Sequence, residues 1–448
     1  MTAAATAPEL TVVSQPQPAC KVRVVTATSL FDGHDAAINV MRRILQAHGA
    51  EVIHLGHNRG AEEIVDAAIQ EDAQAIAVSS YQGGHIEFFK YVVDLLRAKG
   101  SGHVTVWGGG GGVIVPREIE ELHAYGVNRI FSPEDGRRYG LDGMIAMIIE
   151  RANFSTAPSD PLAELGQLRA GASEGAVARL AKLISVVENG GETGDRVAAA
   201  LRAAAVPSVP VLGITGTGGA GKSSLTDELI RRFRLDRDEA LKIAVLAADP
   251  VRRRSGGALL GDRIRMNAIE HPNLYLRSLA TPAGGSELPQ RLDDLVAACR
   301  VAGFDLVIIE TPGIGQGAAG IVAHADLALY VMTPEYGAAS QLEKIDMLDF
   351  ADVVAINKYD RPGGADALRD VRRQVQRNRE DWGTPPADLP VFGTIASRFN
   401  DDGVTALYQH LSERLAALGL PPAGGRLAAV TTRASTGSGL ASPSVGVP

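Results

Sequence analysis

The 448-residue sequence contains few cysteines and few aromatic residues: two cysteines in all, and 5% aromatic residues. Cys20 and Cys299 lie far apart in the sequence, and neither has a neighbouring cysteine. This arrangement excludes a disulfide framework and a cysteine-based metal site, and it fits a reducing compartment. The sequence therefore predicts a cytoplasmic localisation.

The sequence also lacks a long apolar run and an excess of basic residues. No apolar stretch reaches the roughly 20 residues that a transmembrane helix needs. The first residues, "MTAAATAPELTVVSQPQPAC", lack the positive end and the apolar core of a secretory signal. The formal net charge of −8 disfavours a general nucleic-acid-binding surface. We therefore expect small molecules and other proteins as partners, and neither nucleic acid nor a membrane.

What the sequence does contain is an alternation of short β-rich runs and helical patterns. Five such runs within residues 21–151 predict an α/β domain with a doubly wound parallel sheet, flavodoxin-like and Rossmann-type. Residues 152–206 are rich in Ala, Leu and Glu and predict a helical connector. A second α/β alternation over residues 207–420 is long enough for a P-loop nucleotide-binding domain. Residues 1–20 are predicted to be a disordered lead-in, and residues 421–448 a linker or disordered tail.

The strongest motif is "GTGGAGKS" at residues 216–223, which follows an apolar run and precedes a helical pattern. In such a loop backbone N–H groups surround the phosphates, Lys222 meets the β and γ oxygens, and the Ser223 hydroxyl ligates Mg²⁺. The residues predicted to bind nucleotide here are Gly216, Gly218, Gly219, Ala220, Gly221, Lys222, Ser223 and Ser224.

A second motif, "NKYD" at residues 357–360, indicates the base of the nucleotide. A carboxylate at Asp360 accepts hydrogen bonds from the ring N–H and the exocyclic amine of guanine, whereas adenine offers no such pair of donors on that edge. Asn357 and Lys358 complete the motif, and Ala396 in "TIASRFN" is placed to support the base. The sequence therefore predicts GTP as the nucleotide.

Carboxylates follow other strand-like runs of the same region. Glu310 lies three residues before Gly313, an acid-x-x-Gly pattern whose glycine N–H reaches a γ-phosphate. Asp249 and Asp262 are candidate acids on the Mg²⁺ side, although either also fits an ordinary turn. The small GTPases of the Ras class carry a water-orienting glutamine where this sequence has Ile314. We therefore expect slow unaided hydrolysis.

The first α/β region carries its own polar residues at strand ends. Asp32 and His34 follow the first run, Ser79 ends the third, and five glycines at residues 108–112 end the fourth. These positions share the carboxyl edge of the predicted sheet, where ligands bind. A serine and a run of glycines indicate a slot for a bulky ligand, and Asp32 can hold His34 in one tautomer, as for metal-binding imidazoles. From these residues alone, a capping or half-buried structural histidine is the alternative.

At this point the sequence resembles a known family. The series Asp32-Gly33-His34-Asp35-Ala36-Ala37, then Ser79-Ser80-Tyr81, then the glycine run is similar to the D-x-H-x-x-G, S-x-L, G-G signature of cobalamin-dependent mutases and methionine synthase. Two positions depart, because Ala37 replaces a glycine and Tyr81 a leucine. "SLFDGHDAAINVMRRIL" and "SSYQGGHIEFFKY" resemble the cobalamin domain of the fused isobutyryl-CoA mutases, and "RSGGALLGDRIRMNAI" resembles their built-in mutase-chaperone GTPase. The resemblance covers about residues 21–420.

The resemblance implies roles for individual residues. His34 becomes the lower axial ligand of cobalt in adenosylcobalamin, beside Asp32. The cofactor's dimethylbenzimidazole tail then lies by Ser79, Gly108, Gly109 and Gly110. The implied Mg²⁺ ligands are Ser223, Asp249, Asp262 and Glu310.

The resemblance also implies a switch segment. Gln341 and Lys344 fall in the part of the family that senses the nucleotide and contacts the mutase, so they join Lys222 and Glu310 as the predicted catalytic residues. Family members usually carry serine at the position of Pro312 and an acid at that of Ala318. Since proline lacks a backbone donor, we expect altered phosphate sensing.

The sequence therefore predicts the adenosylcobalamin-binding and GTPase portion of an acyl-CoA mutase of the isobutyryl-CoA type. GTP binding and hydrolysis would gate cofactor loading for the radical rearrangement of a branched acyl-CoA. Isomerase activity is expected only with a separate mutase catalytic domain or subunit, and the complete protein is expected to be a homodimer. One alternative is a cobalamin-binding regulatory module with a GTPase timer. The other is a nickel-type metallochaperone GTPase, which would need Cys/His clusters near the nucleotide domain.

Overall fold

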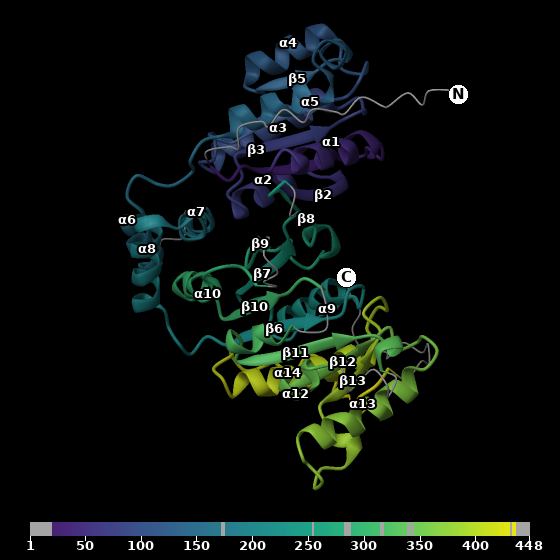
Figure 1. The fold of residues 1–448 in the computed structure, drawn as a ribbon. Coiled ribbons are helices and arrows are strands. Elements are labelled where there is room, and N and C mark those ends of the chain that lie inside the picture. The colour runs from purple at the N-terminus through teal and green to yellow at the C-terminus, as the bar shows by residue number, and fades with distance from the viewer. Residues whose placement is uncertain are drawn as a thin grey trace, which may run out of the picture.

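The computed structural model describes residues 20–171, 175–252, 255–281, 288–313, 318–337, 342, 345–430 and 432–435. Two parallel sheets with helices on their faces dominate the molecule, and a group of short helices lies beside them (Figure 1). This confirms the predicted fold class, two doubly wound α/β units.

The first sheet has the strand order β5-β4-β3-β1-β2-β8, with every pair parallel. Its first five strands are β1 (Arg23–Ser29), β2 (Glu51–Arg59), β3 (Ala75–Ser79), β4 (Thr105–Gly109) and β5 (Arg129–Phe131). The helices between them are α1 (Ala36–Ala47), α2 (Ala61–Gln70), α3 (His85–Ala98), α4 (Pro116–Tyr125) and α5 (Pro133–Ala152). The order of these five strands is that of flavodoxin-like folds, which places ligands outside the carboxyl ends of β1 and β3.

The sixth strand of this sheet comes from a distant part of the sequence. Strand β8 (Ala258–Leu260) pairs in parallel with Glu51, Val52 and Ile53 of β2. The sequence predicts five strands for this sheet and places residues 207–420 in the other domain. A strand of three residues has no measurable periodicity, and its partner lies about 200 residues earlier, so local patterns do not reveal it.

The connecting helices are α6 (Pro161–Arg169), α7 (Ala176–Asn189) and α8 (Gly191–Ala204). Their apolar side chains, among them Leu180, Leu183 and Leu201, pack into one core with the second sheet. The segment is helical, as its composition predicts, and it covers the second sheet rather than forming a free linker. The exact domain limits stay a prediction.

The second sheet has the order β13-β12-β11-β6-β10-β7-β9, again all parallel. Its strands are β6 (Val211–Gly216), β7 (Ile243–Pro250), β9 (Leu274–Thr281), β10 (Leu306–Glu310), β11 (Leu327–Met332), β12 (Val353–Asn357) and β13 (Val391–Thr394). The α-helices of this half are α9 (Lys222–Leu235), α10 (Leu292–Val301), α12 (Met347–Phe350), α13 (Gly364–Asn378) and α14 (Asp402–Ala416). Short 3₁₀ turns are η1 (Arg263–Arg265), η2 (Ala318–Ala323), η3 (Pro334–Tyr336) and η4 (Pro386–Asp388). The strands are continuously apolar because helices cover both faces.

The predicted C-terminal tail is partly ordered against the second sheet. The Arg426 backbone N–H donates to Asp236 Oδ1 at 2.7 Å, and the Ser435 N–H donates to the Gly393 carbonyl of β13 at 3.0 Å. These contacts use backbone groups, which explains why the Ser- and Gly-rich sequence gave no sign of them. The predicted lead-in, apart from Cys20, lies outside the described residues.

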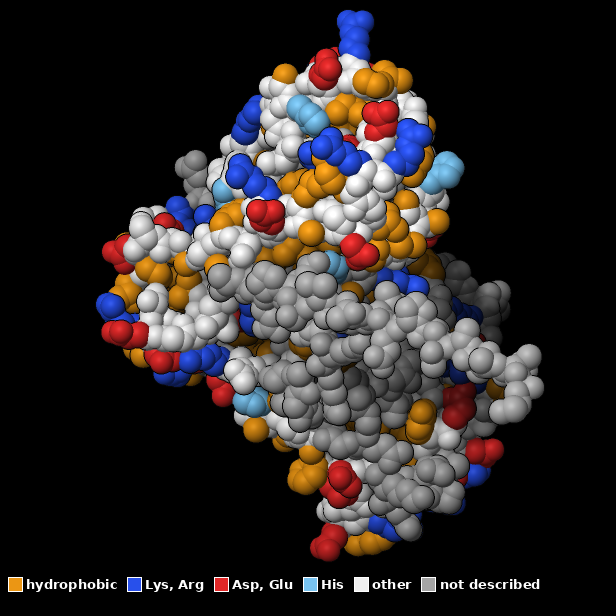
Figure 2. Space-filling model, turned by 45° about the horizontal axis from the view of Figure 1, so that its top comes forward, with side chains coloured by type: hydrophobic (Ala, Val, Ile, Leu, Met, Phe, Trp, Pro, Cys, Tyr) orange, Lys and Arg blue, Asp and Glu red, His pale blue; other side chains and the backbone are white. Residues whose placement is uncertain are grey.

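The described surface carries charges of both signs. In Figure 2, basic and acidic side chains are interspersed with hydrophobic ones over the upper part of the molecule. Within the part of the chain that the structure describes, no helix is long and apolar enough to cross a bilayer.

Candidate functional site

Asp32 and His34 meet in the loop after β1, at the carboxyl edge of the first sheet. His34 Nδ1 lies 2.8 Å from Asp32 Oδ1, which also accepts a hydrogen bond from the His34 backbone N–H at 2.9 Å. The Tyr81 backbone N–H donates to Asp32 Oδ2. Burial acts to raise the pKa of Asp32, but the hydrogen bonds from Tyr81 and His34 outweigh it and lower this pKa below its usual value. Asp32 is therefore an ionised, fixed acceptor.

This contact determines which ring nitrogen of His34 is available. An ionised carboxylate only accepts hydrogen bonds, so the proton of a neutral ring resides on Nδ1. Nε2 then keeps its lone pair, and the side chain is 77% exposed. An exposed imidazole with a carboxylate behind it is the arrangement that suits a metal ligand. The structure thus fits the role that the resemblance implies for His34.

A cavity of about 230 Å³ opens beside this loop. Ser79 and Gly108–Gly111 line it at the ends of β3 and β4, and Trp107, Met144 and Ile148 supply apolar walls. The cavity brings together Ser79, Gly108, Gly109 and Gly110, as the sequence predicts, and its mostly apolar lining suits a flat heteroaromatic group.

Two of the glycines are required by the protein itself. A Cβ at Gly108 would lie 2.4 Å from Phe89 Cζ, and one at Gly110 would lie 2.0 Å from the Ser80 carbonyl oxygen. The interpretation that the whole glycine run makes room for a ligand is therefore incomplete, because these positions are also needed for packing inside the domain.

The structure adds Phe31 and Asn58 to this site. Phe31 is 84% exposed and has a φ of 64°, while its backbone N–H donates to Asn58 Oδ1 at 2.8 Å. A bulky residue in the left-handed region is strained and is held there by its surroundings. No sequence signal marks Phe31 as special, since its conformation depends on a contact 27 residues away.

The phosphate-binding loop joins β6 to α9. Lys222 is the first residue of α9, and its Nζ donates to the carbonyl oxygens of Gly216 and Thr217 at 3.3 Å each. Gly221 has a φ of 83°, and a Cβ there would lie 2.6 Å from Asn357 Nδ2. A Cβ at Gly313 would lie 2.5 Å from Lys222 Nζ. The loop, the lysine and the acid-x-x-Gly glycine therefore converge on one point.

The base-recognition motif lies at the adjacent strand end. Asn357 Nδ2 donates to the Ala220 carbonyl at 2.8 Å, and Asn357 Oδ1 accepts from the Ala396 N–H at 3.0 Å. Lys358 Nζ donates to the Gly219 carbonyl at 2.7 Å. Asp360 is exposed at the end of the motif. Asn357 thus ties the base loop to the phosphate loop and to the "TIASRFN" segment.

Ser223, Asp262 and Glu310 form a buried polar cluster below the phosphate loop, whereas Ser224 faces outward. Ser223 Oγ donates to Glu310 Oε1 at 2.7 Å and lies 3.3 Å from Asp262 Oδ1. Burial, and secondly Asp262, raise the pKa of Glu310 to about 8. Glu310 Oε2 is buried without a hydrogen-bond partner among the described residues. Uncompensated carboxylates of this kind fit a cation.

Asp249 completes the cluster from the end of β7, where its Oδ2 accepts from the Gly261 N–H at 2.9 Å. Burial, followed by repulsion from Asp262, raises the pKa of Asp249 to about 7. No group of three or more His, Cys, Asp or Glu side chains in the described ranges is close enough to make a metal site alone. Mg²⁺ in nucleotide sites takes one or two protein ligands together with phosphates and water, so these residues suit it.

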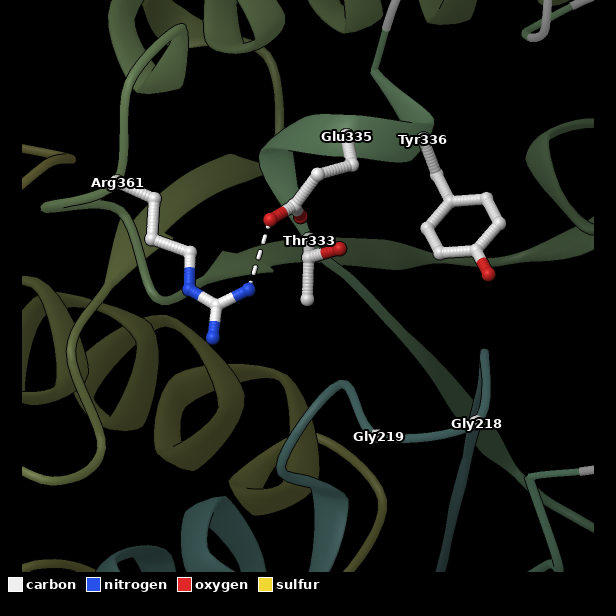
Figure 3. A pocket seen from close by; sticks show the side chains of 6 residues that line it. All are labelled: Gly218, Gly219, Thr333, Glu335, Tyr336 and Arg361. Carbon is white, nitrogen blue, oxygen red and sulfur yellow. Dashed lines mark hydrogen bonds and ion pairs between the residues drawn. The ribbon is translucent and has the colours of Figure 1, made fainter.

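A pocket of about 520 Å³ lies on the outer side of the phosphate loop. Figure 3 shows Glu335 and Arg361 pointing toward each other above Gly218 and Gly219, with Tyr336 at the far side. Glu335 Oε1 and Arg361 Nη1 are 2.7 Å apart. The ion pair links η3 to the residue after Asp360. Both side chains are about half exposed, so the pair contributes little stability.

Three residues singled out from the sequence, Ile314, Gln341 and Lys344, lie outside the described residues. Pro312 is buried immediately before Gly313.

The two sites define a class of protein: a flavodoxin-like domain with an exposed, carboxylate-paired histidine on its edge, joined to a P-loop GTPase. A family model for a B12 binding domain matches residues 22–135, and one for the methylmalonyl-CoA mutase-associated GTPase MeaB matches residues 180–426. The chain belongs to the MeaB family of mutase-associated GTPases and carries a B12-binding domain. The GTPase match begins within α7, inside the predicted connector.

Relatives with both domains are similar over nearly the whole chain. A fused isobutyryl-CoA mutase of Cupriavidus metallidurans is 63% identical over 426 residues, which cover 95% of this chain and 38% of the relative. One of Geobacillus kaustophilus is 56% identical, covering 89% of this chain and 37% of the relative. A putative GTPase of Pyrococcus horikoshii is 33% identical, covering 52% of this chain and 72% of the relative.

These matches confirm the resemblance predicted from the sequence, and with it a cobalamin-binding domain and a GTPase. The chain spans less than two fifths of the length of these two fused mutases.

Proposed function

We propose that the first domain binds adenosylcobalamin with His34 Nε2 as the lower ligand of cobalt. The observation that carries this proposal is the contact between Asp32 and His34 Nδ1, which leaves Nε2 unprotonated and exposed beside the apolar cavity. Bound cobalamin supplies a cobalt–carbon bond that breaks homolytically. Asp32 would hold the imidazole of His34, and the cavity lined by Ser79, Gly108, Gly109 and Gly110 would hold the dimethylbenzimidazole of the cofactor.

Electron paramagnetic resonance of the reduced cobalt form tests this assignment. We expect the nitrogen hyperfine lines to change when histidine is isotope-labelled and to stay unchanged when the cofactor's dimethylbenzimidazole is labelled. Lines that follow the labelled dimethylbenzimidazole would show that His34 is not the ligand.

We also propose that the second domain binds GTP with Mg²⁺ in preference to ATP. Ser223, Asp249, Asp262 and Glu310 hold the cation directly or through water, and Lys222 contacts the β and γ oxygens. Asp360 accepts from guanine, with Asn357, Lys358 and Ala396 bracing the base loop. Gly313 and the glycines of the phosphate loop approach the γ-phosphate. Calorimetry with each nucleotide tests the preference, and equal affinities would contradict it.

Together these sites suit the cofactor-loading portion of an acyl-CoA mutase of the isobutyryl-CoA type. In this proposal GTP binding and hydrolysis control entry of adenosylcobalamin, and a mutase catalytic domain or subunit performs the radical rearrangement. Gln341 and Lys344 would report the nucleotide state to that partner. We further propose a cytoplasmic homodimer in the complete protein. The relatives similar over nearly the whole chain are fused isobutyryl-CoA mutases, which favours this function over the nickel-type alternative.

Reconstitution with a catalytic partner tests the combined function. The chain is loaded with adenosylcobalamin and assayed for GTP hydrolysis and isobutyryl-CoA isomerisation, with and without a mutase catalytic subunit. We expect isomerisation only with the partner, and faster GTP hydrolysis in its presence. Isomerisation by the chain alone would contradict the proposal.

A further inference from the structure

The segment between Asp249 and Asp262 begins and ends at the nucleotide site, but its middle belongs to the cobalamin-binding domain. Strand β8 pairs with β2, and Ala258 and Leu260 are fully buried within the apolar core of that domain. In Figure 1, β8 lies between the two halves of the molecule. At the near end, the Gly261 N–H donates to Asp249 Oδ2 at 2.9 Å. The two acids are therefore attached to the edge of the other domain's sheet.

The residue after Asp262 is held by a second contact with that domain. Arg263 Nε donates to Glu71 Oε1 at 2.8 Å, and Arg263 Nη2 donates to Gln70 Oε1 at 2.7 Å. Gln70 ends α2, and Glu71 follows it. Arg263 Nη2 also donates to the Leu276 carbonyl of β9. A planar guanidinium held by acceptors on two sides has little freedom to shift.

Glu71 is itself completely buried and fully engaged. Its oxygens accept from Arg263, from Arg23 Nη1 at 3.2 Å, and from the Ser278 N–H and Oγ at 2.8 to 3.1 Å. Arg23 and Glu71 belong to the cobalamin-binding domain, whereas Arg263 and Ser278 belong to the GTPase. If one member of such a buried network is removed, the remaining charged groups lose their hydrogen-bond partners, which is costly. The side chains of the network are therefore held in one arrangement.

We propose that Glu71 of the cobalamin-binding domain is a positioning residue for the GTPase, which acts through Arg263 to hold Asp262 at the Mg²⁺ site. The inference rests on the proposed Mg²⁺–GTP function and adds to it a residue outside the nucleotide-binding domain. Asp262 adjoins Arg263 directly, and its Oδ1 lies 3.3 Å from Ser223 Oγ. A shift of Arg263 therefore moves Asp262 away from Ser223.

The test measures the Mg²⁺ dependence of GTP affinity by calorimetry, with the full chain in Mg²⁺ and in a chelator. The quantity compared is the ratio of the two affinities. In Glu71→Gln we expect this ratio to fall roughly tenfold, while the affinity in chelator stays at the parent value. Damage to the cation site lowers only the GTP affinity in Mg²⁺, whereas damage to the phosphate loop lowers the affinity in chelator as well.

Glu188→Gln is the matched control. Glu188 is a buried carboxylate of α7 that accepts from Arg277 Nη2 at 2.6 Å, so its removal disturbs the same region. Because no contact joins Glu188 to Arg263 in the described structure, we expect the ratio of the two GTP affinities in Glu188→Gln to equal that of the parent chain. A fall in Glu188→Gln equal to that in Glu71→Gln would overturn the proposal, because any loosening of the region would then suffice.

Gly257→Ala tests the same coupling without changing a charge. A Cβ at Gly257 would lie 2.2 Å from the Gln46 carbonyl oxygen and 2.8 Å from that of Ala50, so the variant pushes β8 away from the first sheet. We expect its ratio to fall as well, and this variant decides the question if Glu71→Gln does not fold. If Glu71→Gln and Gly257→Ala fold and keep the affinity ratio of the parent chain, the proposal is overturned. If the parent chain itself shows no Mg²⁺ enhancement of GTP binding, the proposed nucleotide function is wrong as well.

Discussion

The two ligand sites of this chain differ in how their charged groups are satisfied. At the cobalamin edge Asp32 is fully hydrogen-bonded, and His34 is 77% exposed beside an open cavity. At the nucleotide site Asp262 and Glu310 are buried beside the partly buried Asp249, and desolvation raises the pKa values of all three carboxyl groups. The first site satisfies its carboxylate with hydrogen bonds. The second brings together carboxylates that repel one another, and a bound cation would compensate their charge.

The largest effect is expected from breaking the nucleotide site alone. Lys222→Ala removes the charge that meets the β and γ oxygens, and we expect GTP hydrolysis to fall by roughly 10²- to 10³-fold. Cobalamin affinity, followed by absorbance, should stay at the parent value, because Lys222 Nζ donates to the Gly216 and Thr217 carbonyls of the phosphate loop, in the other domain. A matching loss of cobalamin binding would show that the two sites are not separable.

The next largest effect is expected from removing the carboxylate that holds the His34 ring. In Asp32→Asn the amide no longer requires the proton of His34 to reside on Nδ1, so we expect cobalamin affinity to fall roughly 10- to 100-fold. Absorbance titration measures it. Asp142→Asn is the control, since Asp142 Oδ1 also contacts a histidine ring, at 3.2 Å from His48 Nε2, but the Asp142 side chain is 81% exposed. An equal loss in both variants would contradict the assigned role of Asp32.

A smaller change is expected at the guanine-recognition loop. Asp360→Asn keeps the shape of the side chain but replaces one acceptor oxygen with a donor, so we expect the preference for GTP over ATP to fall by roughly tenfold. Calorimetry with both nucleotides measures it. Glu335→Gln is the comparison: it removes the exposed ion pair to Arg361 and should alter the preference little. If Glu335→Gln lowers the preference for GTP more than Asp360→Asn does, Glu335 rather than Asp360 determines the choice of base.

The smallest effect is expected in the pH dependence of stability, where each domain contributes one histidine. Burial lowers the pKa of His54, in β2, and of His410, in α14, to about 4. An unfolded histidine has a pKa of about 6.5, so the unfolded chain binds more protons between these values. Stability should therefore fall as the pH drops from about 6.5 toward about 4. His54→Gln and His410→Gln should each flatten this fall in melting temperature. If the melting temperature of the variants depends on pH as in the parent chain, these two histidines do not cause the loss of stability.

How much of each site could be predicted depends on how local its geometry is. The phosphate loop and the Asp32–His34 contact involve neighbours in sequence at a strand end, so residue types and spacing were sufficient to predict them. Asn357, Ala220 and Ala396 were each predicted from the sequence to bind the nucleotide, and the structure supplies the hydrogen bonds that join them. The roles of Gly108 and Gly110 were predicted incompletely, since the atoms that crowd them come from α3 and from the end of β3.

By itself, the sequence determined two α/β domains, a P-loop with a guanine motif, and a histidine at the edge of a flavodoxin-like sheet. These features follow from periodicity and from residue chemistry within short windows. Only the tertiary structure decided that β8 completes the cobalamin domain's sheet and that Glu71 holds Arg263, 192 residues away. A three-residue strand has no period to recognise, and a buried ion pair between domains leaves no local trace. Such contacts depend on how the two folded units meet.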